Sequence, residues 1–308
     1  MLCNVRLSSS STRWKTRQGK DSFARKAKLE GLKSRAAFKL LEVDAKYKIF
    51  KRGQTVVDLG YAPGSWSQVA VERTKPNGRI VGIDIIPAQP PKGVSTIQGN
   101  FLSEGVRAEV KRFLEDPNQG RPTASLAAPV EITNTATDNE SSIDESRLQS
   151  NADSIGKVTS SKPSKKGQDD SGKMVDVVLS DMSEPWPLET PSSWKRSLSD
   201  PYIRMMNTSG INYKDHAGSM DLCSAALQFA RDTLKTGGHF VCKFYQGAED
   251  KELEKELRKT FKAVHREKPE SSRSESREAY FVAMRRKKES TEDAGSQDKP
   301  DMEASKIE

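Results

Sequence analysis

The sequence is poor in cysteine and has no long hydrophobic run. Only three of its 308 residues are cysteines, and their spacing fits neither a metal site nor a disulfide framework, which favours a reducing compartment. No apolar stretch approaches the ~20 residues that a transmembrane helix needs, so we predict no membrane span. Hydrophobic residues make up 34% of the chain and charged residues 31%. This hydrophobic content is low for a single core formed by the whole chain.

Aromatic residues are missing from 120–173, which reads as Ser, Thr, Asn, Asp, Glu and Lys. The tail 287–308 has the same polar character. Such segments cannot bury enough apolar surface to offset the entropy of ordering them. We therefore predict one α/β domain formed by 21–119 and 174–286. The insertion 120–173 is predicted to be disordered, with a small partner-binding module as the alternative, and the tail is predicted to be disordered.

Positive charge is concentrated at the start of the chain. The formal net charge is +8, and residues 1–52 hold fifteen Lys and Arg against four acidic residues. Such a surface next to a ligand loop favours a nucleic-acid partner, and a solvated charged face is the alternative. Residues 1–20 are basic and serine-rich and contain no acidic residue, which is typical of a mitochondrial transit signal. A basic, disordered terminus is the alternative.

Strand-like and helix-like segments alternate along the rest of the chain. The segment 21–50 is helical in character, with Gly31 as its weak point, and Ser219 is a candidate N-cap for a helix that Gly237 and Gly238 would end. This alternation predicts a parallel sheet with right-handed crossovers. The predicted strands are 55–59, 79–85, 94–98, a stretch beginning at 174, 239–244, 261–266 and 279–285. Helices are predicted at 65–74, from the third strand to about 114, and at 251–260.

A glycine-containing loop follows the first predicted strand. Gly60 and Gly64 flank Pro63 and would let the backbone approach a ligand closely. The spacing is not the G-x-G-x-x-G of dinucleotide sites, which disfavours a nicotinamide cofactor. Asp84, at the end of the next strand, could accept hydrogen bonds from a ribose. The alternative is a tight turn with a helix-capping Asp.

Seven separated motifs carry a resemblance to a known family. They are SRAAFKL, VVDLGYAPGSWSQ, GIDIIP, QGNF, VVLSDM, GGHFVCKFYQG and SSRSESREAY. In this order they resemble the FtsJ/RrmJ family of RNA ribose 2′-O-methyltransferases, over about 12–285 without the insertion. The resemblance implies a Rossmann-like methyltransferase fold, an α/β structure whose seven-stranded, mostly parallel sheet has helices on both sides and an antiparallel last strand.

The same resemblance implies S-adenosyl-L-methionine as cofactor and assigns the site residues. The expected catalytic residues are Lys39, Asp181, Lys243 and Glu278. The expected cofactor-binding residues are Gly60, Pro63, Gly64, Ser65, Trp66, Asp84, Asn100 and Asp181. Asn100 departs from the family, which usually has aspartate there to accept from the adenine amino group. Because an asparagine carbonyl still accepts one such bond, we expect weaker cofactor binding rather than loss of activity. No metal site is expected.

A ribose 2′-hydroxyl must lose its proton as it is methylated, so the enzyme needs a base. A lysine amine serves where burial or a second cation lowers its pKa. We assign Lys243 as this base and Lys39 as the neighbouring cation. Asp181 would orient the Lys243 amine, and Glu278 would hold Lys39 or the ribose. Without the resemblance, each of these residues would be interpreted as an ordinary surface or capping residue.

The predicted substrate is large-subunit ribosomal RNA of mitochondria, modified at a uridine in the matrix. Three features favour this branch of the family: the basic start of the chain, a length far below that of the nucleolar members, and the opening SSSSTRWKTRQ. The similarity begins near Thr12, which leaves little room for a cleavable presequence. A tRNA anticodon-loop ribose methyltransferase is the alternative enzyme, and a non-catalytic RNA-binding ribosome-assembly factor is the alternative from another class. A nicotinamide-dependent dehydrogenase is the least favoured of these alternatives.

Overall fold

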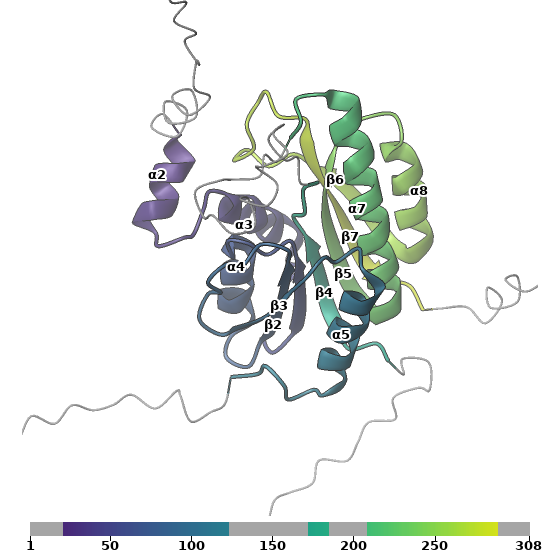
Figure 1. Cartoon of the computed structure of the whole chain (residues 1–308). Helices are drawn as coiled ribbons and strands as arrows, with labels where there is room; N and C mark the ends of the chain where they lie inside the picture. Colours follow the sequence, from purple (N-terminus) through teal and green to yellow (C-terminus); the bar gives the residue numbers. More distant parts are fainter. Residues whose placement is uncertain (1–20, 123–171, 185–207, 289–308) are drawn as a thin grey trace, which may run out of the picture. The chain divides into compact units, whose positions relative to one another are not determined.

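A seven-stranded sheet forms the centre of the fold (Figure 1). The computed structural model describes residues 21–122, 172–184 and 208–288. The strand order is β3-β2-β1-β4-β5-β7-β6, and all neighbouring pairs are parallel except those that β7 makes with β5 and β6. The strands are β1 Thr55–Leu59, β2 Arg79–Asp84, β3 Val94–Gln98, β4 Val175–Ser180, β5 Leu234–Tyr245, β6 Phe261–Glu267 and β7 Glu278–Arg286. The predicted mostly parallel sheet with an antiparallel last strand is confirmed.

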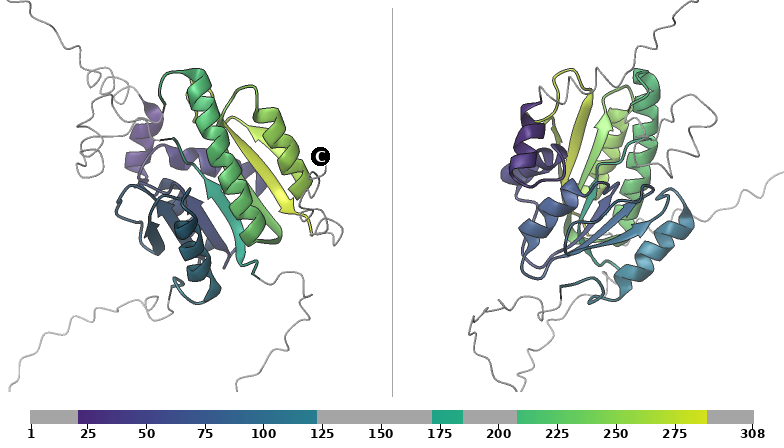
Figure 2. Two further views of the ribbon diagram at one scale, coloured as in Figure 1. Left: turned by 45° about the vertical axis from the view of Figure 1, so that its right-hand side comes forward. Right: turned by 60° about the vertical axis from the view of Figure 1, so that its left-hand side comes forward.

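Helices cover both faces of the sheet (Figures 1 and 2). Helices α5, α7 and α8 pack on one face, and α3 and α4 pack on the other. The short helix α2 lies beside α3. The helices are α2 Ser22–Leu29, α3 Ala36–Tyr47, α4 Ser65–Thr74, α5 Glu104–Glu115, α7 Asn212–Thr233 and α8 Asp250–Thr260.

The central strands are apolar on both sides because each face is covered. In β1, Val57 and Leu59 belong to the cluster with α5, α7 and α8, whereas Val56 belongs to the cluster with α3 and α4. Side chains of a strand alternate between faces, so a strand buried on both sides reads as a continuous apolar run. This explains why β1 and β4 could be recognised from the sequence.

The predicted helical segment 21–50 contains two helices, and they are separated at its predicted weak point, where Gly31 adopts a left-handed conformation with φ 67° after α2 has ended. Two other local predictions were wrong. Ser219 is not an N-cap, since α7 begins at Asn212 and Ser219 is buried inside it. Gly237 and Gly238 do not end that helix but lie within β5.

The domain prediction falls partly on residues that the structure does not describe. The described residues all belong to one compact unit. The predicted N-terminus 1–20, nearly all of the insertion 120–173 and nearly all of the tail 287–308 lie outside the described residues. Within the described ranges, no helix is both long and apolar enough to cross a membrane.

Candidate active site

The predicted cofactor residues lie where four neighbouring strands end. Strands β3, β2, β1 and β4 are adjacent and parallel, so their carboxyl ends share one edge of the sheet. Asp84 ends β2, and its carboxylate accepts from the backbone N–H of Ala62 and of Ile86, each at 2.9 Å. Ala62 belongs to the glycine loop after β1. Asp84 therefore fixes this loop and keeps lone pairs for a ligand hydroxyl.

Both glycines of the loop are required by the protein itself. Gly60 and Gly64 have φ values of 77° and 104°. A Cβ added to Gly60 would lie 2.8 Å from Met182 Cγ and 2.9 Å from Met182 Cα, and one added to Gly64 would lie 2.7 Å from Pro91 Cδ. The loop can approach its neighbours this closely only without side chains at these two positions.

Trp66 contributes its side chain to the fold rather than to an open surface. Its indole is buried, donates from Nε1 to the Ala36 carbonyl at 2.9 Å, and lies 5.6 Å from the Tyr280 ring. Ser65 is also buried, and its Oγ is 2.6 Å from Ser34 Oγ. These contacts join the start of α4 to α3 and its preceding linker. Only the backbone of Ser65 and Trp66 is left to face a ligand.

Pro63 and Asn100 are exposed at the same edge. Asn100 follows β3, and its Oδ1 accepts from the Leu102 backbone N–H at 3.0 Å. The amide oxygen therefore holds its own turn and has one lone pair left, whereas a carboxylate would have more.

Three acidic side chains, Asp58, Asp84 and Asp181, lie close together around the loop. Burial raises the pKa of the Asp58 carboxyl to about 7; the charges of Asp181 and Asp84 add to this rise, and the hydrogen bond from Ser67 opposes it. Burial also raises the pKa of Asp84. A cationic ligand would relieve this repulsion, so the group suits a positively charged sulfonium.

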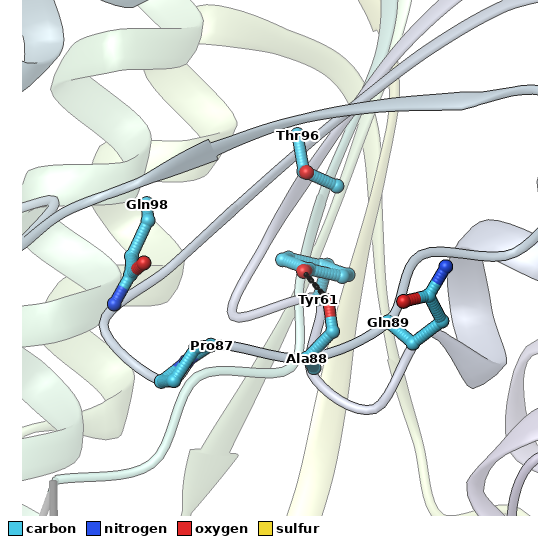
Figure 3. Close-up of a pocket in the computed structure, with 6 residues that line it drawn as sticks. All are labelled: Tyr61, Pro87, Ala88, Gln89, Thr96 and Gln98. Atoms are coloured by element: carbon cyan, nitrogen blue, oxygen red, sulfur yellow. Dashed lines mark hydrogen bonds between the residues drawn. The ribbon is translucent and has the colours of Figure 1, made fainter. Parts of the chain in front are cut away.

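A hollow of about 340 Å³ lies beside the loop (Figure 3). The Tyr61 hydroxyl donates to the Ala88 carbonyl at 2.6 Å, and Figure 3 draws this hydrogen bond between the two lining residues. The hollow contains none of the predicted cofactor residues. Its lining residues are Tyr61, Pro87, Ala88, Gln89, Thr96 and Gln98.

The four predicted catalytic residues come together as two ion pairs in one pocket. Lys39 Nζ lies 2.6 Å from Glu278 Oε1, and Lys243 Nζ lies 3.2 Å from Asp181 Oδ1. Their side chains are between 6% and 19% exposed, so they are shielded but reachable. All four line a pocket of about 520 Å³, which we call the cluster pocket.

Two further contacts hold Lys243 in place. Its Nζ donates to the Asp181 backbone carbonyl at 2.7 Å and to Ser183 Oγ at 2.6 Å. Together with the Asp181 carboxylate, these acceptors fix the amine at the carboxyl end of β5. No feature of the sequence distinguishes Ser183, because a serine after a strand is common.

Two tyrosines lie next to the ion pairs: Tyr245 of β5 lines the cluster pocket, and Tyr280 of β7 is buried behind it. The antiparallel register places Lys243 opposite Tyr280 and Tyr245 opposite Glu278. Tyr280 is buried; its hydroxyl donates to Asp181 Oδ1 at 3.3 Å, and its ring lies 5.8 Å from Lys39 Nζ. Tyr280 therefore bridges the two ion pairs. We did not predict a role for either tyrosine, although Tyr280 lies in the quoted motif around Glu278.

The surroundings fix the charge states of two pocket residues. Burial alone would raise the pKa of Glu278, but the charge and hydrogen bond of Lys39 and the charge of Lys243 outweigh it, so this pKa lies below its usual value. Burial, with the charge of Glu278, raises the pKa of Tyr245 to about 12. Near neutral pH, Glu278 is a carboxylate and Tyr245 keeps its hydroxyl proton.

The predicted basic N-terminal segment reaches both parts of the site. Arg35 lines the cluster pocket and is held by Asp21 and by the Ser271 carbonyl. Lys33 donates to the Gln89 carbonyl at 2.6 Å, beside the glycine loop. The described residues contain no group of three or more His, Cys, Asp or Glu that could hold a metal.

Comparison with known proteins places this geometry in a family. The sequence matches the family of FtsJ-like methyltransferases over residues 32–286. It is 38% identical to rRNA methyltransferase 2, mitochondrial, of Saccharomyces cerevisiae, over 91% of this chain and 89% of that protein. It is 33% identical to the protein of the same name in Schizosaccharomyces pombe, over 89% and 95%.

A bacterial relative and a solved structure agree with this match. Ribosomal RNA large subunit methyltransferase E of Parvibaculum lavamentivorans is 33% identical, over 90% of this chain and 82% of that protein. The crystal structure of a candidate ribosomal RNA methyltransferase of Plasmodium falciparum superposes with a TM-score of 0.53 at 25% identity, over 83% of this chain and 99% of that chain.

Proposed function

Because the chain belongs to the FtsJ-like methyltransferase family, we propose that it methylates a ribose 2′-hydroxyl of large-subunit ribosomal RNA with S-adenosyl-L-methionine as methyl donor. The observation that carries the proposal is the cluster pocket, where Lys243 is paired with Asp181 and Lys39 with Glu278. Two amines and two carboxylates in a shielded pocket supply a base, and the groups that orient it, for an uncharged hydroxyl.

The residues at the sheet edge fit the proposed cofactor. Asp84 would accept from ribose hydroxyls, Asn100 would accept from the adenine amino group, and the loop backbone of 60–66 would lie against the remaining atoms. S-adenosyl-L-methionine supplies, when bound, an activated methyl group on a cationic sulfur. The carboxylates of Asp84, at the end of β2, and of Asp181 favour such a cation. Asp181 also contacts Lys243, so the cofactor site and the cluster pocket meet at this residue.

In the cluster pocket, Lys243 would accept the proton of the 2′-hydroxyl as that oxygen takes the methyl group from the sulfur of the cofactor. The Asp181 carbonyl and Ser183 Oγ aim the amine, which provides the alignment that such a transfer needs. We assign Lys39 as the neighbouring cation of this base. Glu278 holds Lys39, and Tyr280 links Asp181 to the face of Lys39.

The comparisons support the RNA class, and the start of the chain supports the compartment. Two relatives named as mitochondrial rRNA methyltransferases align over most of this chain. We infer that the substrate is mitochondrial large-subunit rRNA, at a uridine of the A-loop, and that the basic segment 1–20 directs import to the matrix. A fluorescent reporter fused to residues 1–40 should enter mitochondria, and a cytosolic reporter would contradict this assignment.

The test is transfer of a labelled methyl group to mitochondrial large ribosomal subunits, to their free RNA and to bulk tRNA. Wild type is compared with Lys243→Ala and with Lys235→Ala. Lys235 is a matched control, because it also lies in β5 and pairs with a carboxylate, Asp176, at 2.9 Å, but at the other end of the strand.

We expect label on large-subunit RNA with wild type and Lys235→Ala. With Lys243→Ala the rate should fall by about a hundred-fold or more, since a positioned base contributes on that scale, while cofactor binding is retained. Full activity of Lys243→Ala would remove the base assignment. Label on tRNA alone would identify the tRNA enzyme, and no label with intact cofactor and RNA binding would favour the assembly factor.

A further inference from the structure

The rim of the cluster pocket carries an exposed apolar pair at the start of α7. Gly210, Asn212 and Asp215 line the pocket. Ile211, between Gly210 and Asn212, is 60% exposed, and Tyr213, directly after Asn212, is 76% exposed. Tyr213 follows Asn212 by one position, about 100° around the helix, so it lies on the flank of the pocket-facing side. Among the aromatic residues that the structure describes, Tyr213 alone is exposed.

The turn that presents these side chains is fixed by hydrogen bonds. The Asp215 carboxylate is buried and accepts from the Ser209 backbone N–H at 2.6 Å. The Ile211 N–H donates to Ser209 Oγ at 3.1 Å, and the Asp215 N–H donates to the Ile211 carbonyl at 3.0 Å. Tyr213 is therefore presented on an ordered first turn beside the pocket, which lowers the entropy cost of a contact there.

The chemistry of the pocket indicates what would cover the tyrosine. The loop between β6 and β7 adds Arg273 and Arg277 to the lining, and both are exposed. This suits the phosphates of a polyanion. A ribose that enters the pocket pulls its nucleotide out of the strand's stack, and the flanking base loses a stacking partner. Aromatic side chains replace such partners in single-stranded RNA recognition.

We propose that Tyr213 stacks on a base flanking the target nucleotide and so holds the RNA strand at the mouth of the cluster pocket. The inference rests on the proposed function, since it needs RNA in that pocket. Ile211 adds apolar contact beside the same base. Tyr213 is a positioning residue, because it acts on the nucleotide's neighbour and not on the reacting atoms.

Three variants separate stacking from other roles of the ring. Tyr213→Phe keeps the aromatic face, Tyr213→Leu keeps apolar surface without it, and Tyr213→Ala removes both. Affinity is measured with a fluorescein-labelled transcript of a large-subunit rRNA domain, and kcat and KM are measured with the same RNA. We expect Ala and Leu to raise Kd and KM by about five-fold or more and Phe to stay within about two-fold of wild type, as base stacking predicts. Cofactor affinity and kcat should be retained in all three.

Other results would overturn either the inference or the proposed function, and they distinguish the two. Unchanged RNA affinity in Tyr213→Ala, with methyl transfer intact, would overturn it and leave the proposed function standing. Wild-type affinity in Tyr213→Leu would show a plain apolar contact instead of stacking. RNA affinity that depends on the Tyr213 ring, in a wild type that transfers no methyl group, would uphold the contact and overturn the proposed function.

Discussion

At the scale of single residues, Asp58 has the least favourable surroundings of any carboxylate at the site. It lies in β1 between Val57 and Leu59 and is fully buried. Its Oδ2 accepts from Ser67 Oγ at 2.6 Å, whereas Oδ1 has no hydrogen-bond partner among the described residues. A buried carboxylate with half of its acceptors unpaired favours its protonated form.

The raised pKa of Asp58 predicts a pH dependence of stability. The folded state keeps the proton up to about pH 7, while the unfolded carboxyl, with its usual pKa of 3.8, has already lost it. The free energy of unfolding should therefore fall as pH rises from about 4 to 7. Asp58→Asn removes this contribution, so urea unfolding at pH 5 and pH 7.5 should show a smaller fall than in wild type. Equal falls in both proteins would contradict the account.

A second residue-scale prediction concerns Asn100. Asn100→Asp should bind S-adenosyl-L-methionine about five-fold more tightly, because a carboxylate offers more lone pairs and accepts stronger hydrogen bonds than an amide. Isothermal titration calorimetry measures the change. Asn118→Asp is the control, since it adds the same charge in the exposed turn after α5. Unchanged affinity in Asn100→Asp would show that this position does not contact the cofactor.

At the scale of elements, the seam between α7 and β5 positions Lys243. Ser219 Oγ donates to the His216 carbonyl at 2.7 Å and accepts from the Tyr245 N–H at 3.1 Å. The ring of His216 contacts the Tyr245 carbonyl through Nδ1 at 2.7 Å and accepts from the Glu249 N–H through Nε2 at 3.1 Å. Both residues therefore hold the end of β5, two positions beyond Lys243, against the helix.

Ser219→Ala tests this seam. It would remove the hydroxyl that accepts from the buried Tyr245 N–H, and the loss of this hydrogen bond should lower the free energy of unfolding by about 1–3 kcal/mol. Activity should fall through the displaced end of β5, and cofactor affinity should change less. Ser224→Ala is the control, because Ser224 lies on the exposed side of α7. Urea unfolding compares the two variants, and equal stability would show that Ser219 contributes no net interaction.

The elements that were predictable are those with local signals. The bounds of β1, β3 and α4 agree with the sequence prediction. The apolar β-branched residues of β1 and the glycine loop between β1 and α4 are local signals that mark two of these elements directly. The start of α7 was not predictable. Its first turn is ordered by Asp215 reaching back to Ser209, and the hydroxyl of Ser219 is used by a strand distant in sequence. Tertiary contacts therefore determine both the start of α7 and the use of the Ser219 hydroxyl.

The site was predictable only through the family resemblance. Lys39 and Glu278 lie at opposite ends of the described chain and meet because α3 packs on the face of the sheet that carries Tyr280. No spacing rule reaches over that separation. The contacts of Ser183 and Tyr245 were missed because they depend on side-chain positions at the ends of β4 and β5. The roles assigned to the four catalytic residues remain predictions.

At the scale of the whole chain, the N-terminal segment connects the two parts of the site. The linker 30–35 between α2 and α3 is held to α4 by Gln68, which accepts from the Lys33 N–H at 3.1 Å and donates to the Gly31 carbonyl at 2.8 Å. The same segment supplies Arg35 and Lys39 to the cluster pocket. RNA bound by this basic segment would therefore contact a part of the chain that is also held to α4, the helix that follows the cofactor loop.

The most direct measurement is mapping of ribose methylation in mitochondrial large-subunit rRNA from cells that lack this protein. Mass spectrometry of nuclease fragments locates each 2′-O-methyl group. The account predicts that one uridine of the A-loop loses its methyl group, that wild type restores it, and that an equally abundant Lys243→Ala protein does not. An unchanged methylation pattern in the deleted cells, or full restoration by Lys243→Ala, would contradict it.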